Sequence, residues 1–203
     1  MEEELFCFPS ESATHRLILL HGWGADAEDL MPLGEGLVNS LKDFDVELVS
    51  LRAPQVHPEG IGRQWYGLFP AEWEQASEAV QSLKGRLQRL GSFQLPLEKT
   101  ILLGFSQGGA MAIGAGSSLP LAGIIACSAY LHPGFIPPVK TPPVLFTHGT
   151  QDSIVPMEAS EKLFDLFHHN TSSSQIHLFE GGHEIPQKIY GVIRPFIERC
   201  LCN

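Results

Sequence analysis

The sequence predicts an α/β fold in which helices cover both faces of a mainly parallel central sheet. The first observation is a series of short, largely apolar segments, typical of strands buried on both faces, at residues 16–20, 46–49, 101–103, 121–126 and 143–147. The second observation is that segments with helical patterns separate most of these strands, as parallel pairing requires. Neither an internal repeat nor a shift in composition marks a linker, so we expect residues 1–203 to form one domain.

The remaining elements follow from periodicity and from the residues that start and stop them. Apolar residues at three- and four-residue steps predict a helix over residues 71–90, which Gly91 ends. Residues 52–70 combine prolines, glycines and aromatic residues without periodicity, so we expect a long irregular loop there, and its aromatic residues argue against disorder. Further helices are predicted at residues 26–41, 156–169 and 185–200, and further strands at residues 5–8 and 175–179. The buried strand at residues 46–49 is expected to extend over residues 45–51.

The charge balance excludes several classes of partner. The 203 residues contain 13 Lys and Arg against 23 Asp and Glu, which gives a formal net charge of −10, and they contain no basic cluster. Nucleic acids and anionic lipids are bound by clustered cations, so the sequence predicts neither of them as a partner. No uninterrupted apolar stretch is long enough to cross a bilayer, and we therefore expect no integral membrane association.

The N-terminus and the cysteines indicate the compartment. Residues 2–4 are all acidic, whereas a signal peptide begins with a basic region, so we expect no export by that route. The 4 cysteines show no paired spacing of the kind that binds metals, and a reduced, cytoplasmic state is the simplest interpretation. The histidines fit no familiar ligand motif either, so the sequence predicts no metal site.

The segment from residue 100 to residue 110 carries the main functional signal. In it, Gly104-x-Ser106-x-Gly108 follows an apolar strand and precedes small, helix-compatible residues, which is the pattern of a nucleophile elbow. Such a sharp turn holds its serine in a strained, exposed position, and side chains at the two glycines would collide with the neighbouring strand and helix. Five-residue patterns also arise by chance, so the alternative is a glycine-rich turn of another α/β protein.

Two further residues follow later strands and complete a possible catalytic triad. A serine hydroxyl needs a base within hydrogen-bond reach, and His183 lies in a glycine-rich loop after the strand at residues 175–179. A carboxylate must then orient the imidazole, and Asp152 directly follows the preceding strand. The order Ser106, Asp152, His183 along the chain is the order of the α/β-hydrolases.

Each of these residues also has a structural interpretation. Asp152 could cap the following helix, and most of the 9 histidines are expected to be ordinary surface or core residues. Glu180 and Glu184 are rival carboxylates, although both are too close in sequence to His183 to be favoured as its orienting group. Three partners in the correct order at strand ends nevertheless favour the catalytic interpretation.

A fourth strand end is expected to supply the oxyanion hole. The turn His21-Gly22-Trp23-Gly24 follows the strand at residues 16–20, and its glycines allow a backbone N–H to face the reacting centre. We assign one donor to the backbone N–H of Trp23 and the other to that of Gln107, directly after the candidate nucleophile. A tight turn with a structural histidine is compatible with this assignment, because only the backbone is needed.

Together these motifs resemble a known family. The segments concerned are Gly104-Phe105-Ser106-Gln107-Gly108-Gly109-Ala110, His21-Gly22-x-Gly24, Arg63-x-Trp65-Tyr66, His148-Gly149-x-x-Asp152-x-x-Val155-Pro156 and Gly182-His183. They are similar to those of the acyl-protein thioesterase and phospholipase/carboxylesterase family over nearly the whole chain. The resemblance implies a small α/β-hydrolase without a large cap domain, without a metal or an organic cofactor, and a monomer or homodimer. It also implies activity on carboxylic esters, lysophospholipids or fatty-acyl thioesters, with Trp65 and Ile154 lining or bordering the acyl site.

The sequence departs from the family at positions that bear on the substrate. Trp23 stands where members often have leucine, and Gly67 stands where the best-known thioesterases commonly carry an acidic residue. These departures favour a carboxylesterase for small esters over an acyl-protein thioesterase or lysophospholipase acting on long acyl chains. Trp65 could equally pack under the long loop instead of lining the site. An alternative of another class is a non-catalytic, hydrolase-like module that binds an acyl group, although a binder needs no base and no carboxylate.

Overall fold

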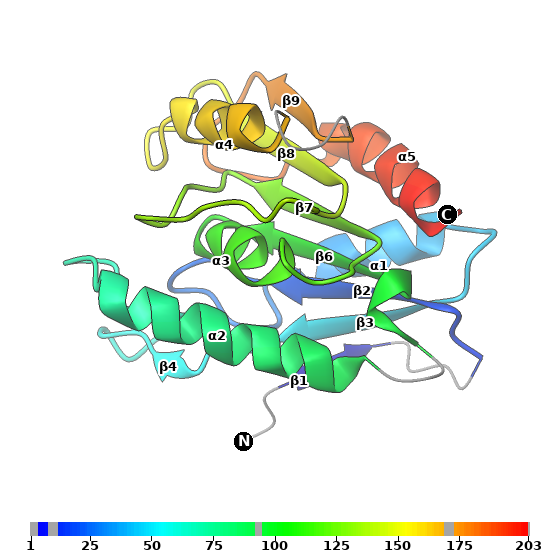
Figure 1. Ribbon diagram of the computed structural model, residues 1–203, viewed down its shortest axis with the longest axis horizontal. Coiled ribbons are helices and arrows are strands. Elements are labelled where there is room, and N and C mark those ends of the chain that lie inside the picture. The colour runs from blue at the N-terminus through cyan, green and yellow to red at the C-terminus, as the bar shows by residue number, and fades with distance from the viewer. Residues whose placement is uncertain (1–3, 8–11, 92–94, 169–172, 203) are drawn as a thin grey trace.

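The computed structural model describes residues 4–7, 12–91, 95–168 and 173–202. Its main sheet has the strand order β1-β3-β2-β6-β7-β8-β9, in which β1 is antiparallel to β3 and the other described pairs are parallel (Figure 1). The strands are β1 (Glu4–Cys7), β2 (His15–Leu20), β3 (Val46–Leu51), β6 (Thr100–Phe105), β7 (Gly123–Cys127), β8 (Val144–Gly149) and β9 (Gln175–Phe179). The predicted α/β fold with a mostly parallel sheet is thereby confirmed.

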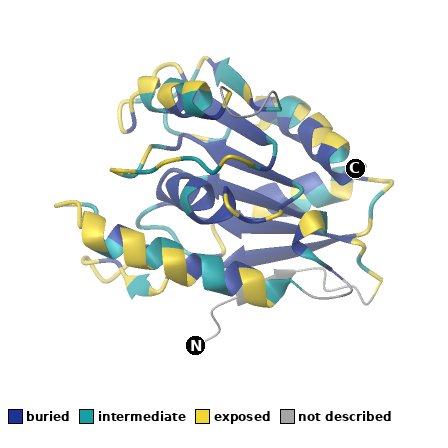
Figure 2. Cartoon of the chain, in the orientation of Figure 1, coloured by how far each residue is buried: buried dark blue, intermediate teal, exposed yellow. Residues whose placement is uncertain are grey.

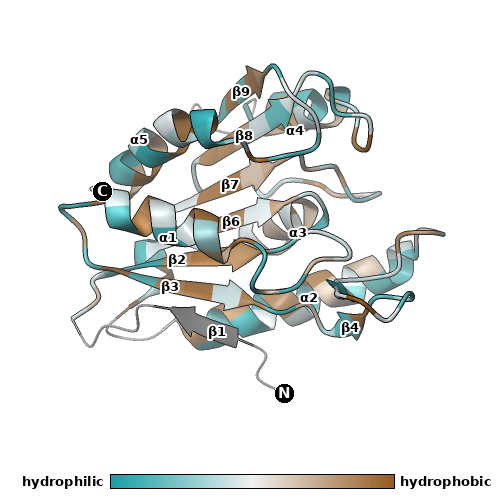
Figure 3. Ribbon diagram, turned by 180° about the vertical axis from the view of Figure 1, so that it is seen from behind, coloured by the Kyte–Doolittle hydropathy of each residue, from teal (hydrophilic) through white to brown (hydrophobic). Residues whose placement is uncertain are grey.

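Five helices cover the two faces of this sheet within the described residues. They are α1 (Met31–Ser40), α2 (Trp73–Leu90), α3 (Gln107–Gly116), α4 (Glu158–His168) and α5 (Tyr190–Leu201). Helices α2, α3 and α4 pack with the sheet into one apolar core, and α1 and α5 pack with it into the other. Figure 1 shows α2, α3 and α4 in front of the sheet, and Figure 3 shows α1 and α5 from the opposite side.

Strand β2 illustrates why its residues form a doubly buried strand. Ile18 and Leu20 point into the core with α2, whereas Leu17 and Leu19 point into the core with α1, and none of the four is more than 1% exposed. Figure 2 shows the same burial along the central strands. Burying each such side chain contributes about 1.5–3 kcal/mol, so a continuous apolar run is most stable when both faces are covered.

The first helix begins later than its pattern predicts. The sequence predicts a start at residue 26, whereas α1 starts at Met31 with Pro32 in its first turn. Proline lacks an N–H and is tolerated in a first turn but not further inside a helix, so Pro32 prevents an earlier start. Asp26 instead accepts hydrogen bonds from the backbone of Ala27 and the guanidinium of Arg52, which stabilise the turn before the helix.

The loop over residues 52–70 is more regular than predicted. It contains a two-stranded antiparallel sheet, β4 (Gln55–Val56) with β5 (Arg63–Gln64), in addition to the bridge between Leu68 and Ala71. Strands of two residues leave no periodicity in the sequence, so pattern alone predicts only a loop.

The other predicted elements are present with small differences at their ends. The edge strand is β1, and residue 8 of the predicted strand lies outside the described residues. The helix predicted over 156–169 is α4, whose predicted last residue also lies outside them. The closing helix is preceded by a 3₁₀ turn, Gln187–Ile189, because Pro186 is extended and the chain becomes α-helical only at Tyr190.

The parallel strands place several loops at one edge of the sheet. The loops that follow β2, β6, β8 and β9 leave the carboxyl ends of their strands at this edge. Between these strands, the described residues form no large cap domain above it. In open parallel sheets ligands bind outside the carboxyl ends of the strands, so this edge is where a site is expected.

Candidate active site

Ser106 occupies the turn between β6 and α3 in a strained conformation. Its φ is +54° and its ψ is −117°, a combination that non-glycine residues rarely adopt. The turn is held by the N–H of Ser106, which donates to the carbonyl of Cys127 at 2.8 Å. A Cβ on Gly104 would lie 2.2 Å from the carbonyl oxygen of Gly108, and a Cβ on Gly108 would lie 2.1 Å from that of Leu20. Glycine is therefore required on both sides of the serine.

His183 and Asp152 are brought together by neighbouring strands. Nδ1 of His183 lies 2.7 Å from Oδ2 of Asp152, with side-chain exposures of 18% and 0%. Strands β8 and β9 pair in parallel, and the pairing continues into the loops, because the N–H groups of Thr150 and Gln151 donate to the carbonyls of Phe179 and Gly181. These backbone bonds fix the spacing of the two side chains.

The environment of Asp152 keeps its carboxylate ionised. Burial alone would raise the pKa of Asp152, but hydrogen bonds from His183 and from the backbone N–H groups of Val155 and Ile154 hold the pKa below its usual value. An ionised carboxylate can only accept, so Nδ1 of His183 carries the proton in this pair. When the ring is neutral, its Nε2 is therefore the acceptor, which is the form that a general base requires.

Ser106 and His183 line the same pocket, of about 510 Å³. The ring of His183 packs on that of Phe105, the residue before Ser106, with 4.8 Å between ring centroids. Within the described residues no hydrogen bond joins Ser106 to His183; in many unliganded active sites this contact is long and tightens when substrate binds. The other lining residues are mostly apolar: Trp23, Leu68, Phe69, Trp73, Tyr130, Ile154, Val155, Pro156 and Ala159.

Two backbone N–H groups near Ser106 are available to a ligand. Gln107 is the first residue of α3, where helical N–H groups have no partner within the helix. Trp23 follows β2 in the turn that precedes Ala25. In the part of the chain that the structure describes, no protein group accepts from the backbone N–H of either Gln107 or Trp23. Both candidate oxyanion donors are thus unoccupied by protein acceptors.

The side chain of Gln107 connects the turn at Ser106 to a distant loop, and the sequence gives no sign of this. Its Oε1 accepts from the backbone N–H of Trp65 at 3.0 Å, and its Nε2 donates to the carbonyl of Tyr66 at 2.9 Å. Gln107 is fully buried, so water cannot replace either bond. We call residues 63–66 the bracing segment.

The bracing segment also holds the turn that carries Trp23. The N–H of Gly24 donates to the carbonyl of Arg63, and the N–H of Arg63 donates to the carbonyl of Ala25. The indole N–H of Trp23 donates to Oε1 of Gln64 at 2.9 Å. The segment therefore connects both candidate oxyanion donors.

His21 has a structural place in this arrangement, as one interpretation of the motif allowed. Burial lowers the pKa of His21, and the neutral ring is held by Ala53, whose N–H donates to Nε2 at 3.1 Å. The other ring nitrogen, Nδ1, lies 2.8 Å from the carbonyl of Gly22.

The structure separates the two residues expected at the acyl site. Ile154 lines the pocket and is 66% exposed. Trp65 is only 1% exposed and lies in the core, where its indole N–H donates to the carbonyl of His21 at 3.0 Å. Trp65 is not among the pocket residues, which agrees with the alternative that it packs under the loop. Phe69, Trp73 and Tyr130 do line the pocket; their only signal in the sequence is that they are aromatic residues in or next to loops.

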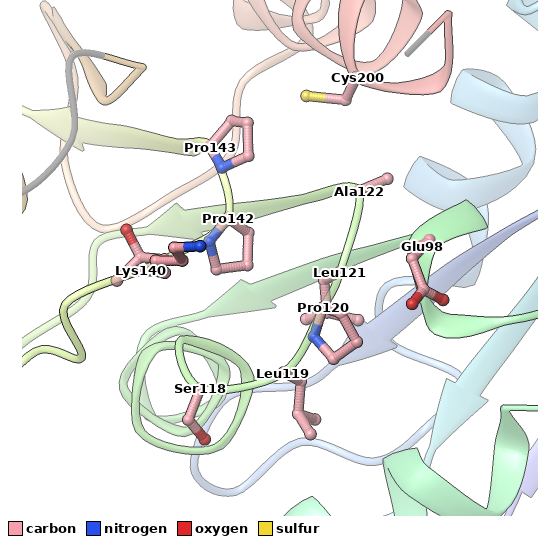
Figure 4. A pocket seen from close by; sticks show the side chains of 11 residues that line it. Glu98, Ser118, Leu119, Pro120, Leu121, Ala122, Lys140, Pro142, Pro143 and Cys200 are labelled. Atoms are coloured by element: carbon pink, nitrogen blue, oxygen red, sulfur yellow. The ribbon is translucent and has the colours of Figure 1, made fainter.

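A second hollow, of about 580 Å³, lies at the opposite edge of the sheet. Figure 4 shows its lining, which includes Ala122 and Pro143, the residues just before β7 and β8, and Cys200 of α5. One acidic residue, Glu98, and one basic residue, Lys140, border it. None of its lining residues also lines the pocket that contains Ser106.

Among the described helices, none is both long and apolar enough to cross a membrane.

The strand order, the covering helices and the serine at a strand–helix turn together define the molecule as an α/β-hydrolase. The model of the phospholipase/carboxylesterase family matches residues 3–201. The chain belongs to the phospholipase/carboxylesterase family. The expected family is thereby confirmed, and the protein is an enzyme that hydrolyses carboxylic esters.

Individual relatives agree with this assignment. Esterase PE8, whose crystal structure is known, is 31% identical to this chain in sequence. The match covers 98% of this chain and 97% of the esterase chain, and the two structures superimpose with a TM-score of 0.86. Acyl-protein thioesterase 1 of Kluyveromyces lactis is 25% identical over 183 residues, which are 79% of this chain and 80% of the relative. The Bacillus cereus carboxylesterase, 19% identical, shares the fold with a TM-score of 0.76 over 97% of this chain and 93% of its own.

Proposed function

We propose that the protein is a serine carboxylesterase that forms an acyl-enzyme on Ser106. The observation that supports this most directly is the 2.7 Å contact between Asp152 and His183, because His183 shares a pocket with Ser106. A buried, ionised carboxylate beside a histidine selects the tautomer that can remove a proton from a serine. The family supplies the reaction class, and these three side chains supply a route for it.

The proposed reaction has two halves. In the first, Nε2 of His183 takes the hydroxyl proton of Ser106 while the serine oxygen attacks the ester carbonyl, and Asp152 stabilises the imidazolium that forms. The tetrahedral intermediate collapses as His183 gives the proton to the leaving alcohol. In the second half, His183 activates a water molecule that hydrolyses the acyl-enzyme and restores Ser106.

The backbone N–H groups of Trp23 and Gln107 are proposed to bind the oxyanion in both halves. Both lack a protein acceptor, and both are held by the bracing segment, directly for Trp23 and through the side chain for Gln107. Donors fixed before the reaction need no reorganisation when charge develops. Removing one donor of an oxyanion hole typically costs about 2.7–4 kcal/mol of transition-state stabilisation.

The pocket supports an apolar acyl group of modest size as the substrate. Its volume, about 510 Å³, lies within the range of about 300–1,000 Å³ of small-molecule sites. The bulky Trp23 lines it and favours small esters. A second candidate, hydrolysis of long acyl thioesters or lysophospholipids, is favoured by the apolar lining and by the similarity to a protein named acyl-protein thioesterase 1.

The test is hydrolysis of p-nitrophenyl esters from acetate to palmitate by the wild type and by Ser106→Ala. We expect the wild type to be active and the variant to lose at least about 10³-fold in kcat. A fluorophosphonate should label the wild type at Ser106. The melting temperature of the variant controls for folding, and matched acyl thioesters compare the two leaving atoms.

Each outcome decides one point. Unchanged activity in Ser106→Ala, or a label on another residue, would reject Ser106 as the nucleophile. A wild type inactive on every ester and thioester would favour an acyl-binding module. An optimum at long chains or on thioesters would replace the small-ester proposal by its second candidate.

A further inference from the structure

A second histidine contacts the candidate catalytic carboxylate, and the proposed reaction does not use it. His148 lies near the end of β8 and is fully buried. Its Nε2 is 3.3 Å from Oδ2 of Asp152 and 2.8 Å from the carbonyl oxygen of Val155. Its Nδ1 is 2.6 Å from the hydroxyl oxygen of Ser160 on α4. Every polar atom of this ring therefore has a partner.

These contacts fix where the proton of His148 resides. Nε2 faces a carbonyl and a carboxylate, neither of which has a hydrogen to donate, so Nε2 must carry the proton. Nδ1 then accepts from the hydroxyl of Ser160. The geometry thus places a hydrogen on Nε2.

The contact adds His148 to the polar groups around Asp152. Oδ1 accepts from the backbone N–H groups of Ile154 and Val155, both at 2.9 Å. Oδ2 is hydrogen-bonded to Nδ1 of His183 at 2.7 Å. It also lies 3.3 Å from Nε2 of His148, whose hydrogen is donated to the carbonyl of Val155. The Asp152 side chain is 0% exposed, so water cannot substitute for a missing donor. Among the described residues, the titratable side chains that contact this carboxylate are these two histidines, and Asp152 is the one that contacts His148.

We propose that His148 is a positioning residue: its Nε2–H donates to the carbonyl of Val155 and so fixes the turn whose N–H groups hold Asp152. The same N–H lies close enough to Oδ2 to draw part of the negative charge of that oxygen away from His183. The inference rests on the proposed function, in which Asp152 orients His183. Two effects follow from loss of the donor. The carboxylate loses one of its restraints, which lowers the rate, and Oδ2 concentrates its charge on His183, which favours the imidazolium. The base is then protonated at a higher pH than in the wild type.

The first experiment compares pH profiles of kcat/KM for a p-nitrophenyl ester in three variants. His148→Leu removes the donor and should lower the plateau by roughly 2- to 10-fold, the effect of losing one neutral hydrogen bond. It should also move the acid limb to higher pH. His148→Gln can still present an N–H near the Nε2 position. Its plateau and its acid limb should therefore both lie between those of His148→Leu and the wild type. Ser160→Ala disturbs the same buried cluster but leaves Nε2–H bonded to the carbonyl of Val155 and beside Asp152. Its acid limb should therefore stay in place even where its melting temperature falls.

The proposal is overturned if folded His148→Leu keeps the wild-type plateau and acid limb, or if Ser160→Ala moves the acid limb as far as His148→Leu does. Should His148→Leu not fold, nitrogen-15 NMR of the wild-type histidines gives an independent answer, with His148→Gln identifying the signal. We expect a ring that carries a hydrogen at Nε2, and a ring protonated only at Nδ1 would contradict the inference. If Asp152→Asn retains wild-type kcat/KM, it is the proposed function that fails, whatever the tautomer of His148.

Discussion

Oε1 of Gln107 accepts a hydrogen bond from the backbone N–H of Trp65 at 3.0 Å, across 42 positions of sequence. The residue after the candidate nucleophile thereby holds the segment that braces the turn carrying Trp23. One side chain connects the two proposed oxyanion donors, which come from different strand ends. Four predictions follow from this and the other contacts of the site.

Gln107→Met should reduce both stability and activity. It leaves the N–H of Trp65 and the carbonyl of Tyr66 without partners in a buried place, at about 1–3 kcal/mol for each group. We expect a lower melting temperature, and kcat reduced more than KM is raised, because the proposed oxyanion donors become less well placed. Gln81→Met, at an exposed position of α2, is the control and should stay within about 0.5 kcal/mol of the wild type in urea unfolding. A wild-type kcat in Gln107→Met would contradict the bracing role.

Ile154→Ala should change chain-length preference and leave stability nearly unaltered. Ile154 is 66% exposed and lines the pocket, so its truncation removes contact with an acyl chain and little core packing. We expect kcat/KM for long esters to fall by up to about tenfold relative to acetate. Val139→Ala, where the native side chain is 90% exposed and away from the pocket, is the matched control. Equal losses on acetate and on longer esters would place Ile154 outside the acyl site.

Trp65→Phe should lower activity by the same factor on every ester. Trp65 lies in the core and not in the pocket, and the substitution removes its hydrogen bond to the carbonyl of His21. The turn carrying Trp23 loses one support, which affects the reaction and not the recognition of the acyl chain. The measurement is the p-nitrophenyl series, and a selective loss on long chains would instead return Trp65 to the substrate site.

Asp152→Asn should destabilise the protein at neutral pH by an amount that shrinks in acid. The pKa of Asp152 is held below its ordinary value of 3.8, so the ionised carboxylate contributes stability that is fully present above that pH. This contribution is lost as the pH falls through the lowered pKa. Urea unfolding of wild type and variant, from neutral pH to below 3.8, measures the difference. Asp165→Asn, at an exposed site, controls for the loss of a charge, and a difference that grows in acid would contradict the assignment.

The sequence was sufficient to predict those features whose signal lies within one short pattern of residues. Strand β2 could be predicted because every residue in it is buried, and Ser106 because its glycines mark the turn. Asp152 and His183 could be placed at strand ends, and parallel pairing of β8 with β9 then brings them together.

The remaining features depend on contacts between distant segments. The side chain of Gln107 looks like any polar residue at the start of a helix until its partners, about 40 positions earlier, are known. Trp65 could not be assigned to core or pocket, because an aromatic residue in a loop without periodicity can face either way. His148 and Asp152 are close in sequence, but their contact depends on the turn after β8, which has no periodic pattern to predict it.

The long spans of these contacts have a consequence for how the enzyme matures. Asp152 and His183 are 31 positions apart, Trp65 and Gln107 are 42, and His21 and Trp65 are 44. Each pairing closes a large loop and so lowers the conformational entropy of the chain. This cost is offset only when the surrounding core has formed. A nascent chain released before strand β9 lacks the proposed base, His183, and a collapsed but incomplete chain lacks the aligned proposed oxyanion donors. Hydrolytic activity should therefore appear only in molecules that have finished folding, so that partly made protein cannot cleave esters indiscriminately.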